Sequence, residues 1–257
     1  MTETPRYAMT KHHIADALSH NRYLLILTVL FTVEVIALSF TPHDRHDWLL
    51  ENVLVAVAVL FFAATYRSFP LSRVSMTLIF LFLCLHEVGA HYTYAEVPYD
   101  AWSEKLFGTS FNAVVGWERN NFDRLVHFLY GLLLAYPMRE AFLRVADGRG
   151  FWGYFFPLLV TMASSMLYEL IEWGAAEYFG GSLGMAYLGT QGDPWDAHKD
   201  MMLASIGALI AMLITAAINL YLKKDFAREW AESLRVKDKR PLGEDELFRL
   251  WRDKKDA

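Results

Sequence analysis

The chain has 257 residues, of which 54% are hydrophobic, 15% aromatic and 21% charged, and its formal net charge is −5. The length alone would suit a large soluble domain, but the apolar residues gather in runs of about twenty, which match the roughly 30 Å hydrocarbon core of a bilayer. The single cysteine, Cys84, lies inside one of these runs and excludes an intrachain disulfide and a thiolate zinc cluster.

The apolar runs, separated by polar connectors, predict an all-α, polytopic membrane protein that forms a bundle of six transmembrane helices. The predicted membrane domain covers residues 23–222, with helices at 23–40, 48–66, 71–92, 122–143, 151–173 and 201–222. The first run could instead belong to a cleaved signal peptide, because Ala37, Leu38 and Ser39 form a passable cleavage site. Its length and the charged Glu34 favour a retained helix.

The distribution of lysine and arginine predicts the orientation in the membrane. With a cytoplasmic N-terminus, the inner connectors and the two end segments hold most basic residues, and the outer connectors hold only five: Arg45, Lys105, Arg119, Arg124 and Lys199. Cytoplasmic loops carry the excess of basic residues in membrane proteins. We therefore expect a multi-pass inner-membrane protein in which residues 1–22 and the charged tail 223–257 are both cytoplasmic.

Pairs of ionisable residues lie one helical turn apart at the ends of several apolar runs. The third run ends with Glu87 and His91, which share a helix face, whereas His86 points about 100° away and is as easily a structural donor. The connector 93–121 is predicted to be a lid or binding loop, or else an amphipathic surface segment. The fourth run opens with Asp123 and His127. Helix capping would account for the aspartate but not for the histidine.

The pairs of ionisable residues at the last two runs consist of carboxylates only. The fifth run ends with Glu169 and Glu172, and charges at that depth must pair, protonate or coordinate a cation. A glycine-rich connector over residues 174–192 is predicted to be flexible or tightly turned. Asp193 then suits a helix cap, and Asp196 and Asp200 lie four residues apart where the sixth run begins.

The predicted topology brings these four pairs to the outer, periplasmic face at similar depth. Helical bundles bind metals with inward-facing constellations of this kind. The predicted ligands of a divalent ion are Glu87, His91, Asp123, His127, Glu169, Glu172, Asp196 and Asp200. Carboxylates with imidazole suit Zn, Mn or Fe, whereas a subset made only of carboxylates suits Mg or Ca. In a catalytic site, His127 would be the general acid or base, and Asp200 and Glu172 would hold the ion.

Two sets of motifs resemble known families. The stretch His86-Glu87-x-x-x-His91-Tyr92 and the stretch Gly192-Asp-Pro-Trp-Asp-Ala-His-Lys-Asp200-Met201 are similar to those of the YjdF-like inner-membrane proteins, a family of unknown function. Asp123-x-x-x-His127, Glu169-x-x-Glu172 and Asp196-x-x-x-Asp200 resemble, more loosely, the signature of VanZ-like membrane proteins. Glu172 and Ala204 depart from the VanZ-like pattern, where Gln and Asn are common.

Two functions therefore remain open for this chain. The first is a metal-assisted hydrolase or transferase that acts on a lipid-linked phosphate at the outer leaflet. The second is a non-enzymatic protein that binds or transports a cation or protons through the same carboxylates. The expected partners are membrane lipid and, for the enzyme, a lipid-phosphate substrate, with no nucleic acid.

Overall fold

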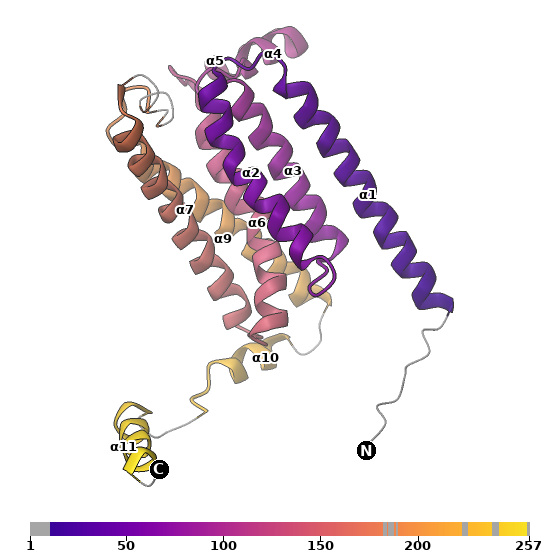
Figure 1. The fold of residues 1–257 in the computed structure, drawn as a ribbon, viewed down its shortest axis with the longest axis vertical. Coiled ribbons are helices and arrows are strands. Elements are labelled where there is room, and N and C mark those ends of the chain that lie inside the picture. The colour runs from indigo at the N-terminus through magenta and orange to yellow at the C-terminus, as the bar shows by residue number, and fades with distance from the viewer. Residues whose placement is uncertain are drawn as a thin grey trace.

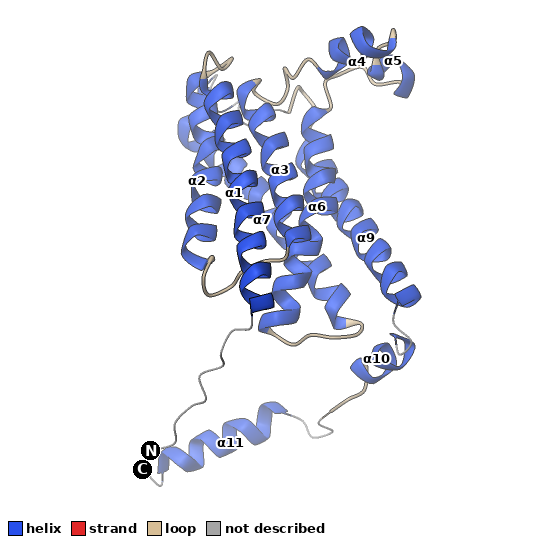
Figure 2. Ribbon diagram, turned by 90° about the vertical axis from the view of Figure 1, so that its right-hand side faces the viewer, coloured by secondary structure: helices blue, strands red, loops and turns tan. Residues whose placement is uncertain are grey.

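In the computed structural model, which describes residues 11–181, 184, 188, 190–222, 226–237 and 242–255, all the regular secondary structure is helical (Figure 2). The predicted all-α class is therefore confirmed. The long helices are α1 (Lys11–Ser39), α2 (Arg45–Thr65), α3 (Arg73–His91), α6 (Phe122–Val145), α7 (Trp152–Phe179) and α9 (Asp196–Leu222). Shorter helices are α4 (Tyr99–Phe107), α5 (Phe111–Val115), α10 (Phe226–Ser233) and α11 (Leu242–Lys255).

Five of the long helices are long and apolar enough to cross a membrane: α2, α3, α7, α9 and the part of α1 from Ser19 to Ser39. The remaining predicted segment, 122–143, corresponds to α6, which carries charged residues near both ends. It nevertheless lies at the centre of the bundle, where it packs against α3, α7 and α9 (Figure 1). A helix surrounded by other helices tolerates polar residues that would be costly against lipid.

The closest packing in the bundle joins α6 to α9. A side chain at Gly131 of α6 would overlap the carbonyl oxygen of Ala204, and one at Gly207 of α9 would overlap that of Phe128. Ala135, Ala204 and Ala208 continue this contact and are fully buried. Small residues let two helix backbones approach closely in a membrane, where packing rather than the hydrophobic effect drives helix association.

The remaining long helices lie outside this pair. α7 packs against both α6 and α9, α3 packs against α6, and α1 and α2 both pack against α3. α1 is peripheral in Figure 1, and its most apolar 18-residue window contains no buried residue. The apolar part of α1 is therefore only partly covered by the rest of the bundle.

The two ends of the bundle carry different segments (Figure 1). The connector between α3 and α6 forms α4 and α5 at one end, with the exposed apolar side chains of Leu106, Phe107 and Val114. At the other end, Phe226 and Trp230 of α10 pack against the core that includes Tyr154 of α7. α7 also continues to Phe179, so the first residues of the predicted glycine-rich connector are helical, and most of residues 182–189 lie outside the described part of the chain.

Candidate metal centre

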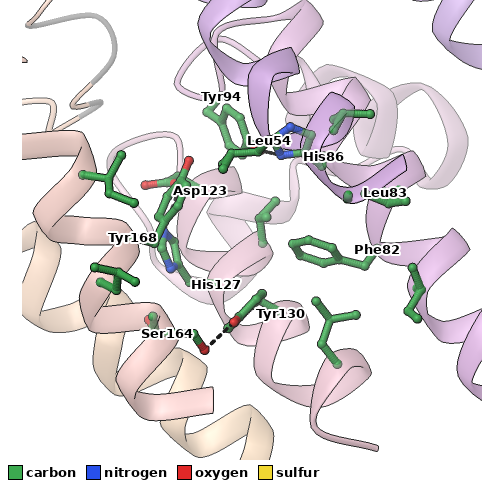
Figure 3. A pocket seen from close by; sticks show the side chains of 18 of the residues that line it. Leu54, Phe82, Leu83, His86, Tyr94, Asp123, His127, Tyr130, Ser164 and Tyr168 are labelled. Atoms are coloured by element: carbon green, nitrogen blue, oxygen red, sulfur yellow. Dashed lines mark hydrogen bonds and ion pairs between the residues drawn. The ribbon is translucent and has the colours of Figure 1, made fainter. Parts of the chain in front are cut away.

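Three of the predicted ligands converge at the end of the bundle that carries α4 and α5. Asp123 and His127 from α6 and Asp200 from α9 each offer one ligand atom, and these atoms lie within 4.8 Å of one another. His127 and Asp200 are buried, with 7% and 2% of their surfaces exposed. Figure 3 shows Asp123 and His127 projecting from α6 beside Tyr168. The close contact of α6 with α9 brings the two helices' side chains together.

Glu169 and Glu172 of α7 extend this group. Glu169 Oε1 lies 3.4 Å from Nε2 of His127, and the same nitrogen lies 3.6 Å from Oδ1 of Asp123. Glu172 is buried and has Asp123 and Glu169 as electrostatic neighbours. We call Asp123, His127, Glu169 and Asp200 the acid–histidine cluster.

The acid–histidine cluster contains oxygen atoms that the described residues leave unsatisfied. Asp200 Oδ1 and Glu169 Oε1 are buried without a hydrogen-bond partner in the described part of the chain. Buried polar atoms of native proteins are almost always bonded to protein, water or an ion. These two oxygen atoms therefore need a partner from outside the described residues, which can be water, a proton or a cation.

Asp196 belongs to a different group, although it lies one turn from Asp200. Its Oδ1 accepts hydrogen bonds from Nη2 of Arg119 at 2.8 Å and from Nη2 of Arg124 at 3.0 Å. Its side chain is only 4% exposed, so these two arginines compensate a buried charge. Asp196 is thus neutralised by the protein itself, and the structure does not bring it among the ligand atoms of the acid–histidine cluster.

Asp193 completes this second group. Its Oδ2 accepts hydrogen bonds from Lys199 and Arg124, both at 2.5 Å, and its Oδ1 accepts one from the backbone N–H of Trp195. The Lys199 ammonium, the Trp195 amide and the Arg124 guanidinium hold the pKa of the Asp193 carboxyl well below its usual range. Asp193 is therefore more than the simple helix cap that the sequence suggests. We call Arg119, Arg124, Asp193, Asp196 and Lys199 the ion-pair network.

The structure places Glu87 and His91 elsewhere. Both oxygens of Glu87 are buried without a hydrogen-bond partner among the described residues, and Glu34 and Asn52 are near its carboxyl group. His91 Nδ1 lies 2.7 Å from the carbonyl oxygen of Leu38, at the end of α1. The helical spacing of this pair is as expected, but α3 does not direct it toward His127.

Beside the acid–histidine cluster lies a polar chain that the sequence reading missed. Tyr94 OH is 2.5 Å from Nδ1 of His86, and Nε2 of His86 lies 3.3 Å from the carbonyl oxygen of Glu51 and 4.0 Å from its carboxylate. Tyr168 OH donates to Oε2 of Glu51 at 3.5 Å, and its ring contacts that of His127. The only sign of Glu51 in the sequence is that a charged residue lies within the apolar run 48–66.

Comparisons with known proteins agree with this picture of a membrane protein. The family model described as "Predicted membrane protein (DUF2238)" matches residues 23–220. The chain is 37% identical over 199 residues to the "Inner membrane protein YjdF" of Escherichia coli (strain K12), an alignment that covers 76% of this chain and 91% of the relative. No solved structure matches the chain. The YjdF-like resemblance is confirmed, whereas the VanZ-like one stays a prediction: the chain is an inner-membrane protein that belongs to the DUF2238 family.

Proposed function

We propose that this protein holds a divalent metal ion between α6 and α9 and uses it to hydrolyse or transfer a lipid-linked phosphate at the periplasmic face. The observation that carries the proposal is the convergence of Asp123, His127 and Asp200, whose ligand atoms lie within 4.8 Å of one another. The unsatisfied Oδ1 of Asp200 supports the same assignment, because a buried carboxylate without a partner is costly.

The donor set fits a catalytic metal better than a structural one. Two carboxylates and one imidazole suit Zn, Mn or Fe, and three protein ligands leave a coordination position for substrate. Mg would fit a carboxylate-only subset that includes Glu169. When bound, such an ion acts as a Lewis acid toward a phosphoryl oxygen.

The surrounding residues supply binding and proton transfer. The N-terminal ends of the long helices α6 and α9 lie at the same end of the bundle (Figure 1). The positive ends of their helix dipoles favour an anionic headgroup. Glu169 Oε1 lies 3.4 Å from Nε2 of His127, so the Glu169 carboxylate is positioned to exchange a proton with this imidazole. Glu172, on the same helix, is also buried.

Elemental analysis of the purified full-length protein tests the metal site. We expect one divalent ion per chain in the wild type, and an affinity at least about 100-fold lower in Asp200→Asn, because a lost direct ligand costs more than a lost outer-shell partner. Glu87→Gln is the matched control, since it neutralises a buried, unpartnered carboxylate away from His127. It is expected to retain the ion.

The proposal is wrong if the wild type takes up no stoichiometric ion after incubation with Zn, Mn, Fe or Mg, or if Asp200→Asn binds as tightly as the wild type. Loss of the ion in Glu87→Gln with retention in Asp200→Asn would move the site to α3. Membrane insertion and the thermal unfolding midpoint are measured for each variant, so that misfolding is not mistaken for a lost ligand.

A second candidate function is proton or cation binding without chemistry. The observation that favours it is the chain from Tyr94 through His86 and Glu51 to Tyr168, which continues toward His127. Ionisable groups in such chains serve as proton relays in membrane proteins. Proton flux into liposomes that contain the protein, abolished in Glu51→Gln and independent of added metal, would favour this function over the metalloenzyme.

A further inference from the structure

A cavity of about 370 Å³ lies between α2, α3, α6 and α7 next to the acid–histidine cluster (Figure 3). One part of its wall is polar and consists of His86, Tyr94, Asp123, His127 and Tyr168. The rest is mainly apolar, with Phe82 and Leu134 among its residues, and at that part Tyr130 and Ser164 satisfy each other at 2.6 Å. The cavity therefore has the polarity of an amphiphile, with a charged end at the candidate metal centre.

Ser165 gives a second sign that the cavity has an occupant. This residue lines the cavity, is only 2% exposed, and its hydroxyl has no hydrogen-bond partner among the described residues. A helical serine commonly satisfies its hydroxyl with the carbonyl of the preceding turn, as Ser164 does with Val160. The Ser165 hydroxyl is therefore available to a polar atom of a bound molecule, one turn from Glu169.

We propose that this cavity binds the single hydrocarbon chain of a phosphate ester, with its phosphate head at Asp123 and His127. The assignment of the head rests on the proposed function, whereas the assignment of the chain rests on the cavity alone. A volume of about 370 Å³ holds roughly twelve groups the size of a water molecule, at about 30 Å³ each, which corresponds to about twelve methylenes. That suffices for about twelve carbons of one chain but not for two chains of that length.

The site also requires a membrane-borne ligand rather than a soluble one. Its apolar walls come from helices whose outer faces are exposed to the bilayer, such as Val57 and Leu60 of α2 at 58% and 69% exposure. A chain that enters from the outer leaflet exchanges one apolar environment for another. Its binding energy then comes from packing and from the headgroup, and not from the hydrophobic effect.

Two tryptophan substitutions on α2 test the chain site. Ala58 lines the cavity and is half-buried, so Ala58→Trp fills it, whereas Ala56 is exposed on the same helix and Ala56→Trp points to lipid. The measurement is saturable binding of radiolabelled dodecyl phosphate to the full-length protein in phosphatidylcholine nanodiscs. We expect wild type and Ala56→Trp to bind alike and Ala58→Trp to bind at least about tenfold more weakly, because an overfilled cavity cannot accept the chain. All three proteins are expected to keep the same metal content and unfolding midpoint.

Three outcomes overturn the inference. The first is no saturable binding of dodecyl phosphate to the wild type, and the second is equal binding to the wild type and to Ala58→Trp. The third is that dioleoyl phosphatidic acid, which has two chains, competes as strongly as dodecyl phosphate and that Ala58→Trp abolishes this competition. If the wild type holds its metal but fails to bind dodecyl phosphate, the chain site is wrong and the metal site stands. If the wild type takes up no metal but still binds dodecanol in a manner that Ala58→Trp abolishes, the chain site stands and the metal proposal fails.

Discussion

Two groups of acids lie side by side at one end of the bundle, and only one is compensated by the protein's own cations. In the ion-pair network, Asp193 and Asp196 each accept hydrogen bonds from basic side chains at 2.5 to 3.0 Å. In the acid–histidine cluster, Asp123, Glu169 and Asp200 face a single histidine, and Asp200 Oδ1 and Glu169 Oε1 have no hydrogen-bond partner among the described residues.

This difference shows how one helix can serve two purposes within a turn. Asp196 and Asp200 look equivalent in the sequence, but Arg119 and Arg124 reach the first, while the second faces α6 deeper in the bundle. Burying a carboxylate without compensation costs more than a folded protein usually tolerates. Asp200 therefore has Arg124 as an electrostatic neighbour but no hydrogen-bond donor for its Oδ1 among the described residues, whereas both acids of the ion-pair network accept hydrogen bonds from basic side chains.

The largest effect on stability is expected when the ion-pair network loses Arg124. Arg124→Gln leaves Asp193 and Asp196 with one fewer partner each, and Asp196 is 4% exposed. We expect a loss of about 3 kcal/mol in the free energy of unfolding, the scale for breaking a buried pair. The measurement is denaturant unfolding in detergent.

Arg149→Gln is the matched control for this prediction, because Arg149 and Asp147 form an ion pair with both side chains more than 70% exposed. Exposed ion pairs contribute little to the free energy of unfolding, so we expect almost no change in this variant. Equal losses in the two variants would contradict the view that burial distinguishes the network. A large drop in metal content in Arg124→Gln at unchanged stability would contradict the separation of the two groups.

A smaller effect is expected from the helix contact that aligns the acid–histidine cluster. Gly131→Ala places a methyl group against the backbone of Ala204, so α6 and α9 must separate. We expect the free energy of unfolding to fall by about 1–3 kcal/mol, as for overpacking elsewhere. Metal binding is also expected to weaken, because His127 lies one turn from Gly131 on α6 and Asp200 lies one turn from Ala204 on α9. Thermal unfolding and metal titration measure the two effects.

Gly174→Ala is the control for this substitution. Gly174 lies in α7, and a side chain there meets nothing within 4 Å. The change is expected to be neutral or to stabilise the helix by up to about 1 kcal/mol, since alanine has the higher helix propensity. If Gly131→Ala behaves in the same way, the close contact does not set the geometry of the cluster.

The sequence predicts the helices well because a membrane span is a property of length and apolarity. The predicted segment 23–40, for example, corresponds to α1 (Lys11–Ser39), whose apolar part starts at Ser19. The predicted segment 48–66 corresponds to α2 (Arg45–Thr65). Helical spacing also identifies residues that share a face, as Asp123 and His127 do. These features depend on local chemistry alone.

The rotation of each helix about its axis cannot be predicted in this way. It depends on which neighbour each helix face contacts, and this decides that Asp200 meets His127 while Glu87 faces Asn52 and Glu34. The partners of Asp196 cannot be predicted either, because Arg119 lies at the end of a connector and Arg124 lies on another helix, far from Asp196 in the sequence. Tertiary contacts of this kind have no periodic signature in one sequence.

The smallest expected effect concerns Asp193 and its dependence on pH. Because Lys199, the Trp195 amide and Arg124 depress the pKa of this carboxyl, its charge stabilises the folded state fully above the unfolded pKa of about 3.9. That stabilisation is lost as the pH falls from there toward the lower folded pKa.

Asp193→Asn keeps the side-chain oxygen that accepts a hydrogen bond from the Trp195 amide but removes the charge. We therefore expect the variant to unfold at a lower temperature than the wild type by the same margin at pH 7 and pH 5, and by a smaller margin at pH 3. The comparison cancels the titration of the other carboxylates, which are common to both proteins. An equal margin at pH 7, pH 5 and pH 3 would mean that the pKa of Asp193 is not depressed in the folded state, and the contrast between the ion-pair network and the acid–histidine cluster would then be wrong.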